Sequence, residues 1–117
     1  SKMESGSSRV DTERVGTILN YSEEHYKSGG LTELAEMMKY DVYWLSREIK
    51  KRTGKTYKEL LQNKRMSQAA YLLTSSAVPV TDIIESVGYD NTSYFYRSFK
   101  ERYQMSPKEY RKNNRAL

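Results

Sequence analysis

Two stretches of this chain, Thr32–Arg52 and Thr81–Arg102, repeat the same plan. Each runs from a residue that can cap a helix, through a short apolar helix and a tight break, to a second helix with a basic outer face. The second helices are expected to begin near Val42 and Asn91, 49 residues apart. A short helix, a tight turn and a second helix form a helix-turn-helix, so the repeat predicts two such units.

The segment between the two repeats predicts one longer helix. Thr56 can cap it, and the apolar residues that follow recur on one face from Tyr57 to about Leu73. Such a helix spans roughly 25 Å, at about 1.5 Å of rise per residue. Two recognition helices reach adjacent major grooves on one face of DNA when their centres lie roughly 34 Å apart. A linker helix of this length, with the half-widths of its flanking helices, can supply that spacing.

No segment of the chain alternates polar and apolar residues as a strand does, so the expected fold is all-α, with about seven helices. Asp11 is expected to cap a first helix that starts near Thr12 and that Gly29 and Gly30 end. Residues 1–8 are small and polar and are expected to be a disordered lead or a remnant of cloning. The expected domains are a first helix-turn-helix subdomain at 9–55, the linker helix at 56–74 and a second helix-turn-helix subdomain at 75–117.

The net charge of +5 is unevenly distributed along the chain. Residues 1–40 carry five Lys or Arg and seven Asp or Glu, a net −2, whereas residues 41–117 carry fifteen and eight, a net +7. A basic excess of this kind is typical of a domain that binds a polyanion, usually a nucleic acid. A solubilising surface charge is the alternative, because many basic domains bind no nucleic acid.

Cysteine is absent from the sequence, which excludes disulfides, cysteine-based zinc sites and a cysteine nucleophile. Its absence fits a reducing cytosol. No apolar run approaches the roughly 20 residues of a membrane helix. His25, the single histidine, lies beside Glu24 on the polar side of the first helix and lacks partners for catalysis or metal binding. No enzyme activity, cofactor or metal site is therefore expected.

Five spaced motifs carry a resemblance to a known family. They are residues 31–35 (LTELA), 45–56 (LSREIKKRTGKT), 83–89 (IIESVGY), 93–100 (SYFYRSFK) and 106–111 (SPKEYR). With these motifs the chain, from about Val15 to Arg111, resembles the C-terminal DNA-binding domain of the AraC/XylS family. It departs from the family pattern at four positions. Glu48 stands in place of an apolar residue, Ile84 of Ala, Tyr89 of Phe and Gln104 of Gly.

The resemblance implies a bacterial, cytoplasmic transcription regulator that binds double-stranded DNA in a sequence-specific manner. It also implies contact with RNA polymerase, and a sensor or dimerisation domain upstream in a longer protein. The present chain is then expected to be a monomeric excised domain, with a small stand-alone member of the family as the alternative. A helical protein-interaction domain without DNA affinity is the alternative function, since helix-turn-helix folds also bind proteins. The related DNA-repair methyltransferase regulators need a reactive cysteine, which this chain lacks.

On the first recognition helix, Leu45 and Ile49 are expected to face inward by helical spacing. Arg47 faces outward and is a candidate either for a bidentate contact to guanine or for a phosphate contact or internal ion pair. Tyr43 could contact a thymine methyl, whereas Trp44 is expected to pack in part against core or backbone. The base-contact candidates on both helices are Tyr43, Ser46, Arg47, Thr92, Ser93, Tyr96 and Arg97.

Phosphate contacts are expected at helix N-termini, where N–H groups and the helix dipole favour an anion, and at nearby basic residues. Arg97 matches the outward arginine of the family, and Lys100 is expected to contact phosphate. Asn91 is expected to cap the second recognition helix rather than to read a base. For any single lysine, a solvated surface position is the alternative. The backbone-contact candidates are Thr32, Lys50, Lys55, Thr56, Lys64, Thr81, Asn91, Lys100, Ser106 and Lys108.

Overall fold

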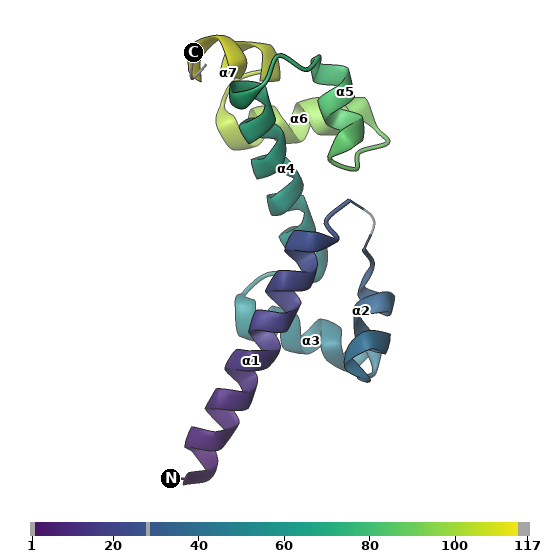
Figure 1. Ribbon diagram of the computed structural model, residues 1–117, viewed down its shortest axis with the longest axis vertical. Coiled ribbons are helices and arrows are strands. Elements are labelled where there is room, and N and C mark those ends of the chain that lie inside the picture. The colour runs from purple at the N-terminus through teal and green to yellow at the C-terminus, as the bar shows by residue number, and fades with distance from the viewer. Residues whose placement is uncertain (1, 28, 115–117) are drawn as a thin grey trace. The chain divides into compact units, whose positions relative to one another are not determined.

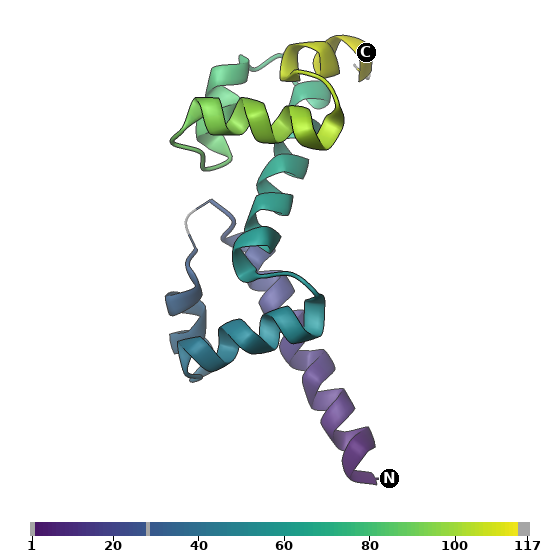
Figure 2. The same ribbon diagram turned by 180° about the vertical axis from the view of Figure 1, so that it is seen from behind.

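The computed structural model describes residues 2–27 and 29–114, with side chains from residue 13 onward. This described part contains seven helices and no strand (Figures 1 and 2), which confirms the expected all-α fold. The helices are α1 Lys2–Glu24, α2 Leu31–Met38, α3 Val42–Thr53, α4 Tyr57–Ser75, α5 Val80–Ser86, α6 Thr92–Tyr103 and α7 Pro107–Asn114. The chain divides into two compact units, unit 1 at Ser1–Gln62 and unit 2 at Asn63–Leu117. Helix α4 begins in unit 1 and ends in unit 2.

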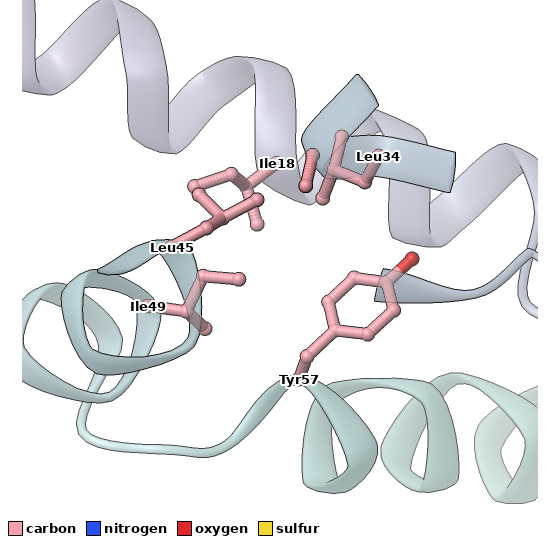
Figure 3. Close-up of a cluster of buried hydrophobic side chains, with 6 residues drawn as sticks. Ile18, Leu34, Leu45, Ile49 and Tyr57 are labelled. Atoms are coloured by element: carbon pink, nitrogen blue, oxygen red, sulfur yellow. The ribbon is translucent and has the colours of Figure 1, made fainter. Parts of the chain in front are cut away.

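In unit 1, α1 and α2 both pack against α3. Their contact is a cluster of buried apolar side chains from three helices and the first turn of α4 (Figure 3). Leu45 and Ile49 are four residues apart, so both point from α3 into this cluster, where neither is more than 1% exposed. Full burial of one such side chain stabilises the fold by about 1.5–3 kcal/mol. The cluster consists of Ile18, Leu34, Ala35, Leu45, Ile49 and Tyr57.

Single residues at the helix ends determine where α2 ends and where α3 begins and ends. Lys39 ends α2 in the left-handed conformation, with φ 61°, and the Tyr40 N–H donates back to the Ala35 carbonyl at 2.9 Å. The Asp41 carboxylate then accepts hydrogen bonds from the N–H groups of Tyr43 and Trp44, both at 3.0 Å, and so caps α3. Gly54 ends α3 with φ 78°.

Unit 2 is built around aromatic side chains. Phe95 and Phe99 are fully buried on α6, with their ring centres 5.7 Å apart. The Phe99 ring also contacts Tyr103 at 4.5 Å and, edge-on, Tyr110 of α7 at 5.5 Å. Large rings therefore supply much of the volume of this small core. The other buried apolar residues of the unit are Met66, Ala69, Ala70, Leu73, Ile83, Ile84, Val87, Tyr89 and Pro107.

Arg111 of α7 holds the end of α4 through backbone carbonyls. Its guanidinium donates to the carbonyls of Leu73 at 2.9 Å, Ser76 at 3.3 Å and Val78 at 2.6 Å. The last carbonyls of a helix have no partner within the helix, so a charged donor from elsewhere is stabilising there. Within unit 2, α7 therefore closes the end of α4 as well as covering α6.

The two helix-turn-helix units match residue by residue, apart from one insertion. Gly88, with φ 100°, takes the place of Lys39, and the Tyr89 N–H donates to the Ile84 carbonyl at 3.1 Å, as Tyr40 does in unit 1. The cap of the second helix follows directly in unit 1 but only after Asp90 in unit 2. The second helices therefore begin 50 residues apart, at Val42 and Thr92, rather than 49.

Three expected N-caps are wrong. Thr32 and Thr81 lie inside α2 and α5, whose N-caps are Gly30 and Pro79, neither with a side-chain cap bond. Pro79 has a fixed φ of −56° and no N–H to satisfy, so the chain can enter the helix directly after it. Asp11 lies within α1, not at its start.

Helix α1 extends from Lys2 to Glu24. Residues 2–8, expected to be a disordered lead, therefore belong to a helix, and no proline interrupts it. The helix ends five residues before Gly29. Of the two neighbouring aliphatic residues of α1, Ile18 is 3% exposed and Leu19 is 40% exposed, so only Ile18 belongs to the core.

Candidate nucleic-acid interface

The outer faces of α3 and α6 carry all seven residues predicted to contact bases. Each of these seven side chains is exposed. Tyr43 on α3 is 74% exposed and Tyr96 on α6 is 41% exposed. They form two groups, one in each unit: Tyr43, Ser46 and Arg47 on α3, and Thr92, Ser93, Tyr96 and Arg97 on α6.

The basic residues of the two faces occupy equivalent positions. Arg47 and Arg97 are each the sixth residue of their helix, and Lys50 and Lys100 are each the ninth. All four are exposed. The Lys50 ammonium donates to the Gly54 carbonyl at 3.2 Å, an exposed contact at the end of α3. Each helix therefore presents an exposed arginine at its sixth position and an exposed lysine at its ninth.

Trp44 packs rather than projecting outward. It is half-buried and lies against the core cluster of unit 1, with its ring centre 4.8 Å from that of Tyr40. This placement agrees with the packing interpretation of its large ring. The exposed Tyr43 beside it is the aromatic residue of α3 that is available to a partner.

Glu48, which stands where the family has an apolar residue, is half-buried and paired within α3. Its carboxylate accepts a hydrogen bond from Arg52 Nε at 3.4 Å, one helical turn away. It also lines a cavity of about 20 Å³ together with Ile18 and Met38, space for roughly one water molecule. The polar residue is thus accommodated at the edge of the core by an ion pair.

Three of the predicted backbone-contact residues have side chains engaged in helix caps. Thr56 Oγ1 accepts from the Glu59 N–H at 3.1 Å, and Ser106 Oγ accepts from the Glu109 N–H at 3.1 Å. Asn91 Oδ1 accepts from the Tyr94 N–H at 2.9 Å, which confirms its expected role as a cap. Of the remaining candidates, Lys64 is half-buried and six are exposed: Thr32, Lys50, Lys55, Thr81, Lys100 and Lys108.

A polar hollow of about 350 Å³ lies beside the start of α6. Its lining includes Thr81, Glu85, Asp90 and Thr92. Asp90 is the residue by which the turn of unit 2 exceeds the turn of unit 1. The expected separation of 49 residues between the two second helices did not include this insertion.

The described residues contain neither a metal-binding cluster nor a membrane-spanning helix. Residues 13–27 and 29–114 contain no group of three or more His, Asp or Glu side chains able to hold a metal ion. Within the part of the chain that the structure covers, no helix has both the length and the apolar character required to cross a membrane.

Comparison with known proteins agrees with this arrangement. A family profile described as "Helix-turn-helix domain" matches residues 34–113. The multiple antibiotic resistance protein MarA of Escherichia coli is 27% identical over 106 residues, covering 90% of this chain and 84% of that protein. The xylose operon regulatory protein of Haemophilus influenzae is 33% identical over 69 residues, covering 59% of this chain and 18% of that protein. The chain thus spans less than a fifth of this second relative.

A solved structure gives the same result for the fold. The C-terminal domain of AraT, a response regulator from Geobacillus stearothermophilus, superposes with a TM-score of 0.79 at 34% identity, covering 88% of this chain and 87% of that chain. The matched profile includes both helix-turn-helix units, from Leu34 in α2 to Asn113 in α7. The chain therefore belongs to the AraC/XylS family of helix-turn-helix, DNA-binding transcription regulators.

Proposed function

We propose that this chain binds a specific double-stranded DNA site by placing α3 and α6 in adjacent major grooves. The observation that carries the proposal is the equivalence of Arg47 and Arg97, exposed at the same position of two matching helices. A guanidinium can donate two hydrogen bonds to O6 and N7 of guanine, a pattern that distinguishes guanine from the other bases in the major groove. Each unit then reads one short segment of the site.

Lysines and helix N-termini supply the second part of the proposed mechanism. Lys100 and Lys108 in unit 2 and Lys50 and Lys55 in unit 1 are exposed near the recognition helices. Contacts of such groups with phosphate set the position of the protein on DNA without reading its sequence. Thr56, Asn91 and Ser106 are engaged as caps, so at these sites the backbone N–H groups, rather than the side chains, would face phosphate.

The wider setting follows the family. A cytoplasmic location is part of the proposal, as the family implies. This chain is also proposed to bind DNA as a monomer, because its two reading units replace the two subunits of a dimer. Contact with RNA polymerase would convert DNA binding into regulation of transcription. Among the relatives, AraT is described as a response regulator and MarA as a multiple antibiotic resistance protein.

Selection of duplex DNA from a random pool, followed by binding over a series of salt concentrations, tests the proposal. The expected selected site has two half-sites whose centres lie about one helical turn apart. The logarithm of the affinity should fall with the logarithm of the salt concentration, with a slope of about −0.9 for each phosphate contact. A flat salt response and no enriched sequence would instead favour the protein-interaction alternative.

A further inference from the structure

Unit 2 contains a stack of four side chains that runs from α4 to the outer face of α6. The guanidinium of Arg65 lies over the ring of Tyr89, 5.7 Å from its centre. The ring centres of Tyr89 and Tyr94 are 6.1 Å apart, with 39° between the ring planes. The guanidinium of Arg97 lies over Tyr94, also 5.7 Å from the ring centre. The outermost member of the stack is thus the arginine proposed to read a base.

The inner part of this stack is fixed by the core. Tyr89 is 8% exposed, and its ring meets the fully buried Phe95 edge-on with a centre-to-centre distance of 5.3 Å. Tyr94 is half-buried between this core and the exposed Arg97. Arg97 follows Tyr94 by three residues, so the two side chains lie on the same face of α6. The ring of Tyr94 therefore offers the arginine a surface whose position is set by buried residues.

Unit 1 repeats the inner part of the stack with different residues. The guanidinium of Arg14 lies 5.3 Å from the ring centre of Tyr40, and that ring lies 4.8 Å from Trp44. Tyr40 occupies the same place in its turn as Tyr89, and Trp44, like Tyr94, is the third residue of its recognition helix. Each unit thus contains the same three parts. They are an arginine from the helix before the helix-turn-helix (α1 or α4), a tyrosine from the turn, and an aromatic ring from the recognition helix.

We propose that Tyr94 is a positioning residue for base recognition, which acts by holding Arg97 in the orientation that reaches a base. The inference rests on the base contact proposed for Arg97. An arginine that is already oriented loses less rotamer freedom when it binds, so more of its hydrogen-bonding energy contributes to discrimination between bases. Since an exposed cation held over a ring gains about 0.5–1 kcal/mol, loss of the Tyr94 ring should reduce that discrimination about two- to fivefold.

The test measures discrimination at one base pair. Affinities of the full chain are compared for the selected duplex and for its three substitutions at the base pair whose preference Arg97→Ala abolishes. Tyr94→Leu should reduce the ratio of best to worst affinity about two- to fivefold, and Tyr94→Phe, which keeps the ring, should leave it unchanged. In the Arg97→Ala background, Tyr94→Leu should cause no further loss of discrimination.

The outcomes separate this inference from the proposed function. If Arg97→Ala leaves the preference at every base pair intact, the proposed base contact of Arg97 is wrong. If Arg97→Ala abolishes one preference while Tyr94→Leu keeps it in full, or weakens all four duplexes equally, the positioning role of Tyr94 is wrong. Additive losses in the double variant would also overturn it.

A fluorinated series covers the case in which Tyr94→Leu fails to fold. Phenylalanine with zero, one and three ring fluorines at position 94 keeps the size of the ring and progressively weakens its attraction for a cation. A stepwise fall in discrimination supports the proposal. Equal discrimination across the series overturns it, because the ring would then act only through its shape.

Discussion

Gln104 ends α6 in the same left-handed backbone conformation with which Gly54 ends α3, at φ 63° and 78°. The two residues are counterparts in the two units, and both donate their N–H to the carbonyl of the lysine four residues earlier, at 2.8 Å and 2.9 Å. The glutamine side chain adds a hydrogen bond from Nε2 to the Glu101 carbonyl at 2.8 Å. The same turn therefore uses glycine in unit 1 and glutamine in unit 2.

Replacing Gln104 with Gly should raise the free energy of unfolding by about 0.5–1 kcal/mol. A residue with a Cβ costs about 1–2 kcal/mol in the left-handed region, and the lost side-chain bond and the greater chain entropy of glycine offset part of this gain. The reverse change, Gly54→Gln, is the matched control and should lower stability by a similar amount, since open space surrounds Gly54 and only backbone strain is added. Urea denaturation of both variants measures the effect, and a Gln104→Gly variant less stable than the natural chain would contradict it.

Arg111→Met should destabilise the protein by about 2–3 kcal/mol. Three carbonyls at and beyond the end of α4 lose their charged donor, and hydrogen bonds to charged groups contribute about 1.5–3 kcal/mol each before water replaces part of them. Lys112→Met, a change at the exposed neighbour, should alter stability by less than about 0.5 kcal/mol. If denaturant unfolding gave equal losses of unfolding free energy for the two variants, the Arg111 contacts would contribute nothing to stability.

Asp41→Ala should lower the free energy of unfolding by about 1 kcal/mol, because two N–H groups at the start of α3 lose their acceptor. Asp41→Asn keeps an acceptor oxygen and should recover most of the loss. Thr32→Ala is the control, since Thr32 resembles a cap in the sequence but lies inside α2. If Thr32→Ala lowered the free energy of unfolding as much as Asp41→Ala, Thr32 would be a helix cap, as the sequence predicted.

Stability should fall at alkaline pH in a way that depends on Tyr89. Burial raises the pKa of Tyr89 to about 12, against the smaller opposing effect of Arg65. Between about pH 10 and pH 12 the unfolded chain loses the phenol proton while the folded chain keeps it, so the unfolded state binds fewer protons and stability falls. The difference in unfolding free energy between the natural chain and Tyr89→Phe should be constant below about pH 9.5 and decline above pH 10. Parallel pH curves would contradict the assigned pKa.

Helix positions were the most predictable part of the fold. The linker helix was expected from Tyr57 to about Leu73 and runs from Tyr57 to Ser75. Its start is specified locally: the hydroxyl oxygen of Thr56 accepts the Glu59 N–H, and the same hydroxyl donates to the Glu59 carboxylate at 3.3 Å. Periodic apolar residues recur within a few positions of one another, so a sequence shows the extent of a helix, whereas Thr32 and Thr81 show that a residue inside a helix can be mistaken for its cap.

Contacts between distant residues could not be read in this way. The Arg65–Tyr89 and Arg14–Tyr40 contacts each join an arginine of a helix to a tyrosine in a turn distant along the chain, and no local pattern marks them. The start of α5 was misplaced because Pro79 replaces a side-chain cap by its fixed backbone angle. The outward positions of α3 and α6 followed from helical spacing, whereas their roles on DNA, and the domain limits at 9–55, 56–74 and 75–117, stay predictions.

The most direct test of the account compares the base preferences of the natural chain, Arg47→Ala and Arg97→Ala along the selected duplex. Each arginine should govern one half-site, so each variant should lose about 1–3 kcal/mol on the preferred site and relax the preference in its own half-site only. The two affected positions should lie about one helical turn apart. If both variants weakened binding to every sequence equally, Arg47 and Arg97 would be phosphate contacts, and the claim that each unit reads bases through its arginine would be wrong.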